Sequence, residues 1–280
     1  MYSLKSVNEL TARSIKSILN RARKYKINYD KDYKKYATED TIILPNIRNK
    51  IIGLMFFEPS TRTNYSFQTA LHKHCIKYIE FNENFSSIKK GETLQDTIHT
   101  FECFCDLIVI RHPDKDIFKN IEFTKPVINA GNGADEHPTQ ALLDLFTIYD
   151  NYLHSWNIEE KKTLKISFVG DIKNSRTIHS LIKLIEKYNG NNEHIYNFIG
   201  HDEIVECEEI KSILKPHQIY KNTYCNEDLN NILEFKPDIV YITRIQKERM
   251  DESIDNEIII DNNFLNKLSN DAIVMHPLPR

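Results

Sequence analysis

Short apolar runs alternate along this chain with segments of helical periodicity, and the alternation occurs in two successive series. The first series has strand-like runs at 50–57, 106–110 and 126–130, with helical patterns near 61–75 and 92–104. The second has runs at 165–171, 194–200, 238–244 and 272–278, with helical patterns near 175–188, 226–235 and 262–269. Apolar runs separated by helices are typical of parallel sheets covered by helices on both faces. We therefore predict an α/β protein of two domains, each a parallel sheet flanked by helices.

The boundary between the two series falls after a long helical pattern at 137–153, near the charged stretch 159–162. We place the domains at 1–150 and 151–280. At the other end of the chain, Ser6 and Glu9 have the spacing of a capping box, which predicts that a helix begins at Ser6. The apolar residues expected on its buried side are Leu10, Ile15, Ile18 and Leu19.

Polar residues follow directly on the predicted strands, where α/β proteins bind ligands. In the first domain they are EPSTRT (58–63), RHP (111–113) and NAGNG (129–133), which leads to His137. In the second they are GD (170–171), TR (243–244) and HPLPR (276–280). Six such strand ends in two domains predict an active site in a shared cleft between them.

EPSTRT has the composition of an anion-binding turn. A helix that begins at Ser60 or Thr61 would direct unpaired amides and the positive end of its dipole at the strand end, and Arg62 would add a guanidinium. The alternative is a serine that caps a helix beside a solvated arginine. The glycine loop of P-loop proteins and the G-x-G-x-x-G of dinucleotide-binding proteins are both absent, so neither ligand class is expected.

Overall charge narrows the range of partners. The formal net charge is −3 over 280 residues, which indicates no general affinity for nucleic acid or an anionic membrane. Five cysteines without regular spacing predict reduced thiols in a reducing compartment, with no zinc site. No apolar stretch reaches the length that spans a membrane. We expect a cytoplasmic protein.

Taken together, these stretches resemble the aspartate carbamoyltransferase family. The matching strings are FFEPSTRT (56–63), KKGETLQDT (89–97), IRHP (110–113), NAGNGADEHPTQALLDL (129–145), VGDIKNSRTIHS (169–180), TRIQKER (243–249) and HPLPR (276–280). Ornithine carbamoyltransferases share the S-T-R-T turn, but resemble one another in a His-Cys-Leu-Pro stretch where this chain has His276-Pro-Leu-Pro279, and they lack the Arg244-Ile-Gln246 pattern.

The resemblance implies transfer of a carbamoyl group from carbamoyl phosphate to L-aspartate in pyrimidine biosynthesis, without a cofactor or a metal. It implies that Arg62, Thr63, His137 and Lys90 are catalytic. It implies that carbamoyl phosphate binds to Ser60, Thr61, Arg62, Thr63, Arg111, His137, Gln140, Pro277 and Leu278. It implies that aspartate binds to Lys90, Arg176, Arg244 and Gln246.

Family members are trimers in which a serine and a lysine reach into the neighbouring subunit's site. By this resemblance the lysine is Lys90 and the serine is Ser86 or Ser87, so we expect a homotrimer with shared active sites. The family also continues beyond the position of Arg280 through a helix that returns to the first domain, and a chain without that helix is expected to be less stable or less active. A regulatory chain, or other enzymes of the pathway, are further partners left open. Two alternatives remain: transfer to another amine such as ornithine, and a non-catalytic trimeric scaffold.

Overall fold

The computed structural model describes residues 3–31, 49–82, 86–153, 163–189, 193–200, 207–220, 229–243 and 260–277. The chain divides into two compact units, Met1–Thr139 and Gln140–Arg280, with the division in the first turn of helix α5 (Pro138–Ile148). Each unit is described by itself. In the part of the chain that the structure describes, no helix is long and apolar enough to cross a membrane.

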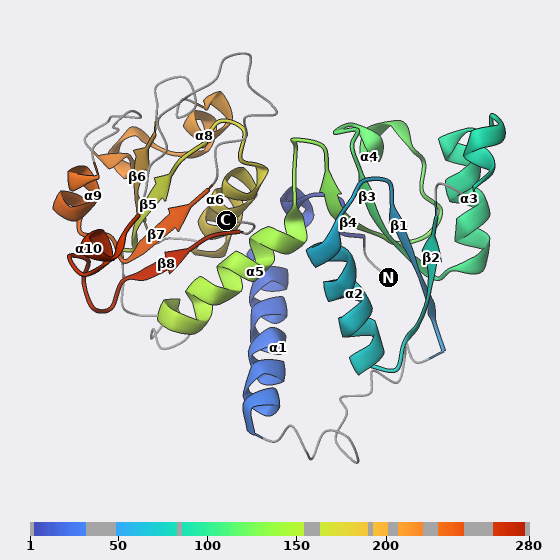
Figure 1. The fold of residues 1–280 in the computed structure, drawn as a ribbon, viewed down its shortest axis with the longest axis horizontal. Helices are drawn as coiled ribbons and strands as arrows, with labels where there is room; N and C mark the ends of the chain where they lie inside the picture. Colours follow the sequence, from blue (N-terminus) through green and yellow to red (C-terminus); the bar gives the residue numbers. More distant parts are fainter. Residues whose placement is uncertain are drawn as a thin grey trace. The chain divides into compact units, whose positions relative to one another are not determined.

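The first unit contains a four-stranded parallel sheet (Figure 1). Its strands are β1 (Ile51–Phe56), β2 (Lys77–Phe81), β3 (Leu107–His112) and β4 (Val127–Asn132), in the order β2-β1-β3-β4. The helices are α1 (Ala12–Lys31), α2 (Thr61–Lys73), α3 (Leu94–Phe104) and α4 (Ile117–Asn120), with 3-10 helices at Val7–Glu9 and Ser87–Lys90. The predicted strands are confirmed. Strand β2 was not predicted.

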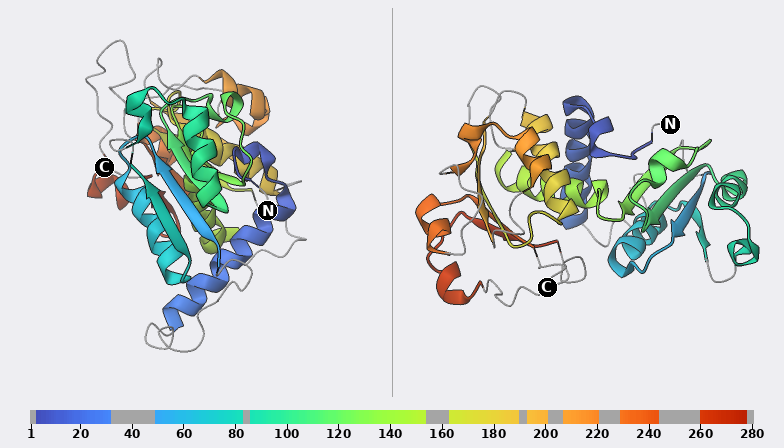
Figure 2. Two further views of the ribbon diagram at one scale, coloured as in Figure 1. Left: turned by 90° about the vertical axis from the view of Figure 1, so that its right-hand side faces the viewer. Right: turned by 90° about the horizontal axis from the view of Figure 1, so that it is seen from above.

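Both faces of this sheet are apolar and covered. On one face Met55, Ile108 and Ile110 pack with residues of α3 and α4. On the other face Leu54 and Val109 pack with side chains of α2, and Figures 1 and 2 show α2 and α3 on opposite sides of the strands. Alternate strand residues point to opposite faces, which is why the strands covered on both faces, such as β1 and β3, have apolar residues at consecutive positions.

The predicted start of the first helix at Ser6 is wrong. Ser6 caps only the 3-10 helix, where its hydroxyl accepts from the N–H of Asn8 at 3.0 Å. Leu10 is then extended (φ −80°, ψ 135°), and α1 begins at Ala12. The reason is a second capping pair: the N–H of Thr11 donates to Ser14 Oγ at 2.8 Å, and the N–H of Ser14 donates to Thr11 Oγ1 at 3.2 Å.

The second unit repeats the architecture. Its parallel strands are β5 (Lys165–Val169), β6 (Ile195–Ile199), β7 (Ile239–Ile242) and β8 (Ile273–Met275), in the order β6-β5-β7-β8. Its helices are α6 (Arg176–Asn189), α8 (Glu208–Ile213), α9 (Asn230–Phe235) and α10 (Asn262–Leu265), together with most of α5, a π-helical turn at Tyr149–Leu153 and a 3-10 helix at Pro216–Gln218. The four predicted strands are confirmed, although each is shorter than predicted, as in β8, which ends at Met275.

Aromatic side chains fill one face of the second sheet. Phe168 stacks with Tyr196 and Phe198 and meets Tyr241 edge-on, with ring centroids 5.6–6.2 Å apart. On the opposite face Val169, Ile199 and Val240 pack with residues of α9 and α10. The two series of the sequence therefore fold as two α/β units with parallel sheets.

Candidate active site

The turn after β1 presents its hydroxyls and one guanidinium at the start of α2. Ser60 is the residue before the helix, and its hydroxyl makes no capping hydrogen bond. Ser60 and Thr63 are half-buried, whereas Thr61 and Arg62 are exposed. The first-turn amides of α2 therefore lack the usual side-chain acceptor and can serve an anion.

Arg111, at the end of the neighbouring strand β3, supplies a second guanidinium that is 13% exposed. Its Nε lies 2.6 Å from Glu58 Oε1, and neither atom makes a hydrogen bond of favourable angle within the described residues. Its Nη1 donates to the carbonyl of Ala130 at 3.5 Å. The charge of Glu58 therefore holds the guanidinium of Arg111 beside the EPSTRT turn.

His137 meets Thr63 in the same unit. The ring is 7% exposed. Its Nε2 lies 3.4 Å from Thr63 Oγ1, and its Nδ1 lies 3.4 Å from Thr139 Oγ1. Gly131 lies beside this grouping: its φ of +117° is readily adopted only by glycine, and a Cβ added there would lie 3.4 Å from Arg111 Nη1 and 3.6 Å from His137 Cδ2. The ends of β1, β3 and β4 thus bring Thr63, Arg111 and His137 close together.

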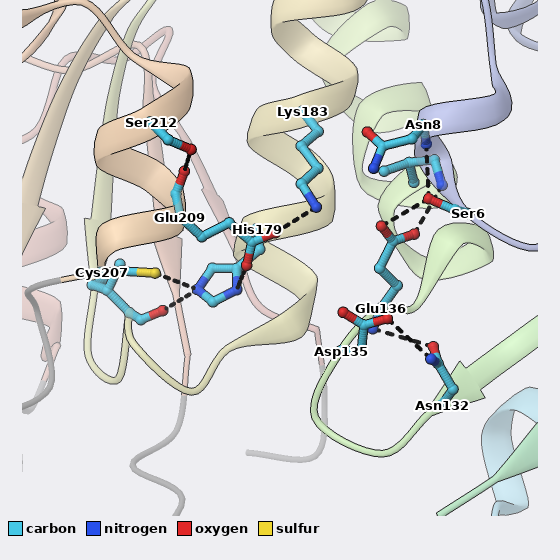
Figure 3. A network of polar contacts seen from close by, with 12 residues as sticks. Ser6, Asn8, Asn132, Asp135, Glu136, His179, Lys183, Cys207, Glu209 and Ser212 are labelled. Atoms are coloured by element: carbon cyan, nitrogen blue, oxygen red, sulfur yellow. Dashed lines mark hydrogen bonds and ion pairs between the residues drawn. The ribbon is translucent and has the colours of Figure 1, made fainter. Parts of the chain in front are cut away.

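Buried polar side chains hold the loop that carries His137, and sequence reasoning did not identify them. Asn129, fully buried, accepts from the N–H of Gly131 at 2.7 Å and donates to Asn132 Oδ1 at 2.8 Å. Glu136, 4% exposed, accepts from Ser6 Oγ at 2.9 Å and from the N–H of Val7 at 2.8 Å (Figure 3). The signal in the sequence was the unusual density of polar residues in NAGNGADEH.

Lys90 and Ser86 lie before α3. Lys90 is exposed at the end of the 3-10 helix Ser87–Lys90, and Ser86 is half-buried. Within the described residues, no hydrogen bond or ion pair joins Lys90 to the group of Thr63, Arg111 and His137. Lys90 and Ser86 therefore remain predictions as parts of a site.

In the second unit, Arg176 is the first residue of α6 and is half-buried. The turn before it is shaped by Gly170 (φ +108°), whose missing side chain allows the backbone of Thr243 to approach. Asp171, fully buried, accepts from the N–H of Asn174 at 3.0 Å. Pro277 is half-buried after β8, and Leu278, Arg244 and Gln246 lie outside the described residues.

Gln140 heads a buried chain of hydrogen bonds. Its Nε2 donates to Asp144 Oδ1 at 3.0 Å, and Tyr241 Oη donates to Asp144 Oδ2 at 2.8 Å. Burial raises the pKa of Asp144 to about 6, although both hydrogen bonds lower it. The Gln140 amide is consequently turned so that its nitrogen faces the carboxylate and its oxygen is left to accept from a ligand. Asp144 was not identified from the sequence.

Comparison with models of known protein families identifies the family of this chain. The carbamoyl-P binding domain of the aspartate/ornithine carbamoyltransferases matches residues 3–150, and the Asp/Orn binding domain of the same family matches residues 162–280. The chain belongs to the aspartate/ornithine carbamoyltransferase family. The strings that suggested this family thus lie within the residues that the two domain models match, which are most of the sequence.

Individual carbamoyltransferases agree with that assignment. The aspartate carbamoyltransferase catalytic subunit of Buchnera aphidicola is 39% identical over 246 residues, which cover 84% of this chain and 75% of that protein. A Trypanosoma cruzi aspartate transcarbamoylase structure, in complex with carbamoyl aspartate and phosphate, matches with a TM-score of 0.80 and 32% identity over 100% of this chain and 84% of that one. The multifunctional protein pyr-3 of Neurospora crassa is 35% identical over 85% of this chain, which spans 13% of that protein's length.

Proposed function

We propose that this chain transfers the carbamoyl group of carbamoyl phosphate to the amine of L-aspartate, giving N-carbamoyl-L-aspartate and phosphate in pyrimidine biosynthesis. The observation that carries the proposal is the match over the whole chain with a structure that holds carbamoyl aspartate and phosphate, because these are the two products of that transfer. The arrangement of Thr63, Arg111 and His137 supports it.

We propose that residues 1–150 bind carbamoyl phosphate and that residues 151–280 bind aspartate. The phosphate would bind among hydroxyls, first-turn amides and guanidinium groups, which suit a dianion. These residues are Ser60, Thr61, Arg62, Thr63 and Arg111. Arg176, Arg244 and Gln246 would bind the two carboxylates of aspartate, and arginine offers each a two-point contact that lysine cannot.

The reaction needs stabilisation of charge on one oxygen. When the aspartate amine attacks the carbonyl carbon, the carbonyl oxygen becomes an oxyanion, and Arg62, Thr63 and His137 would donate to it. Gln140 Oε1, with the backbone of Pro277 and Leu278, would accept from the carbamoyl amino group. Collapse of the intermediate breaks the bond to the phosphate oxygen, and the departing phosphate itself would take the proton lost by the amine.

Orientation supplies much of the remaining acceleration. When two reactants are held in contact, the reaction between them becomes effectively unimolecular, and this lowers the activation free energy by roughly 7–11 kcal/mol in favourable cases. Arg111, fixed by Glu58, and Gln140, fixed by Asp144, are side chains whose positions are set before substrate binds.

The experiment that tests the proposal measures carbamoyl-amino-acid formation with carbamoyl phosphate and either aspartate or ornithine. We expect product with aspartate alone, and none from Arg62→Ala, which loses phosphate and oxyanion contacts together. Product with ornithine and not with aspartate would assign the other activity of the family. A folded chain inactive with both amines would favour a scaffold.

We propose further that the protein is a cytoplasmic homotrimer whose sites are completed by Lys90 and Ser86 of a neighbouring subunit. Arg62→Ala chains and Lys90→Ala chains, each inactive alone, should then regain part of the activity when mixed, because some sites combine intact residues from two subunits. A mixed trimer without recovery would contradict a shared site.

A further inference from the structure

A second group of reactive side chains lies in the second unit and has no part in the proposed reaction. The His179 ring, on α6, is 6% exposed and lies between a thiol and a carboxylate. Its Nε2 is 3.3 Å from Cys207 Sγ, and its Nδ1 is 3.2 Å from Glu209 Oε2 (Figure 3). Thiol, imidazole and carboxylate in this order are the arrangement of an activated nucleophile.

The surroundings of the ring determine its protonation. Nδ1 faces a carboxylate, which only accepts hydrogen bonds, so Nδ1 carries a proton. Nε2 also lies 2.8 Å from the carbonyl of Ile172, and a carbonyl likewise only accepts. Both nitrogens of His179 therefore donate, and the ring is an imidazolium whose positive charge lies beside Cys207 Sγ.

Charges around the group balance when the thiol is ionised. Lys183 Nζ lies 2.5 Å from Glu209 Oε1, and its side chain is 13% exposed. Two cations, Lys183 and His179, then face two anions, Glu209 and the Cys207 thiolate. Burial opposes ionisation of Cys207, but the hydrogen bond and charge of His179 lower the pKa of the thiol. Burial likewise opposes protonation of His179, but its contacts with Cys207 and Glu209 raise its pKa to about 9.

We propose that Cys207 is a thiolate nucleophile and a site of covalent modification by small disulfides. The Cys207 sulfur attacks one sulfur of a low-molecular-weight disulfide, the S–S bond of the reagent breaks, and a mixed disulfide forms on Cys207. The leaving thiolate takes the proton of His179, so the ring ends neutral. Cys207 is 7% exposed, which restricts the reaction to small reagents.

The other described cysteines provide an internal comparison. Cys75 and Cys103 are exposed, and Cys103 Sγ donates to the carbonyl of His99 at 3.4 Å. Cys105 is buried, and burial followed by the charge of Asp106 raises its pKa to about 11. On exposure alone Cys103 would react before Cys207. The proposal predicts the opposite order.

The same three groups could instead hold a metal ion, because their ligand atoms lie within 4.8 Å of one another. Two contacts favour the thiolate. Glu209 is already paired with Lys183, whose charge would repel a cation. His179 faces an acceptor at each nitrogen, whereas a metal ligand needs one nitrogen without a proton.

The test is alkylation and disulfide exchange on the folded, reduced full-length chain, followed by peptide mass spectrometry at each cysteine. Iodoacetamide and 2-hydroxyethyl disulfide are both small and uncharged. At pH 7 an ordinary thiol is only a few per cent ionised, so a larger thiolate fraction, offset by weaker nucleophilicity, predicts that Cys207 reacts several-fold faster than Cys103. In urea the two rates should become equal. If Cys207 of the folded wild-type chain reacts no faster than Cys103, the proposal is wrong.

Variants identify the cause of a fast reaction. Glu209→Gln removes the carboxylate that holds His179 protonated and should slow Cys207 several-fold. Glu208→Gln is the matched control, since Glu208 is exposed and pairs with Lys211. Equal rates in the two variants, or a Cys207 rate that rises when a chelator is added, would contradict the assignment. None of these readouts measures catalytic turnover, so their outcome is independent of whether the proposed carbamoyl transfer is correct.

Discussion

Replacement of Asp144 by asparagine should stabilise the protein and impair its activity. Burial raises the pKa of this carboxyl from 3.8 to about 6, and at about 1.4 kcal/mol per pKa unit the ionised form costs about 3 kcal/mol of folding free energy at neutral pH. Because the folded-state pKa is the higher one, stability from this group is complete below the unfolded pKa of 3.8 and is lost as the pH rises through 6. Asparagine keeps the shape and never ionises.

The assay compares wild type and Asp144→Asn by urea unfolding between pH 4 and pH 8. The difference in unfolding free energy between the two proteins should grow by about 2–2.5 kcal/mol in favour of the variant from pH 4 to pH 7 and stay nearly constant above that. Taking the difference cancels other titrations, such as that of His194, whose pKa burial lowers to about 4. A difference that does not change with pH would refute the reasoning.

The catalytic activity of Asp144→Asn should fall, although its stability rises. The Asp144 carboxylate only accepts, so it holds Gln140 with Nε2 inward, whereas an asparagine amide allows either orientation. A hydrogen bond to the carbamoyl group is worth roughly 0.5–1.5 kcal/mol, so kcat/KM should fall by up to about tenfold. Unchanged kcat/KM would show that Gln140 does not need this support.

Two further substitutions test the first unit. Gly133→Ala should lower the free energy of unfolding by about 2–4 kcal/mol, because φ is +48° and a Cβ would lie 2.5 Å from the carbonyl oxygen of Pro113. Gly91→Ala, at φ +95° with open space around it, should lower it by only about 1–2 kcal/mol, from backbone strain alone. Equal losses in a chemical unfolding experiment would mean that the contact with Pro113 relaxes freely. Thr63→Val keeps the shape of the side chain but removes the hydroxyl that lies 3.4 Å from His137 Nε2. Steady-state kinetics should show a kcat about 100-fold lower, because the oxyanion loses a donor. An unchanged kcat would exclude Thr63 as that donor.

Much of the fold followed from the sequence because buried parallel strands are continuous apolar runs. The strand that escaped prediction, β2, is KYIEF, in which Lys77 and Glu80 are exposed at the sheet edge. A half-exposed edge strand carries no apolar run, and its alternation is too short to distinguish from a loop. Helix α8 was missed for a similar reason, since six residues hold less than two turns of periodicity.

For the site, motifs identified the residues that face a ligand but not the residues that hold them. Glu136 pairs with Ser6 across 130 positions, and Tyr241 with Asp144 across 97. Nothing local in a sequence indicates such partners, because the pairing depends on how strand ends are brought together by the sheet. The contact between His179 and Cys207, which are 28 positions apart, could not be predicted from the sequence for the same reason.

The central claim is that the first domain binds carbamoyl phosphate through the turn after β1 and the second binds aspartate through residues such as Arg176. Calorimetric titration of carbamoyl phosphate into wild type, Arg62→Ala and Arg176→Ala tests it most directly. The account predicts that binding is lost in Arg62→Ala and retained in Arg176→Ala, which should lose only its response to aspartate. Equal loss of carbamoyl phosphate binding in both variants would contradict this division between the domains.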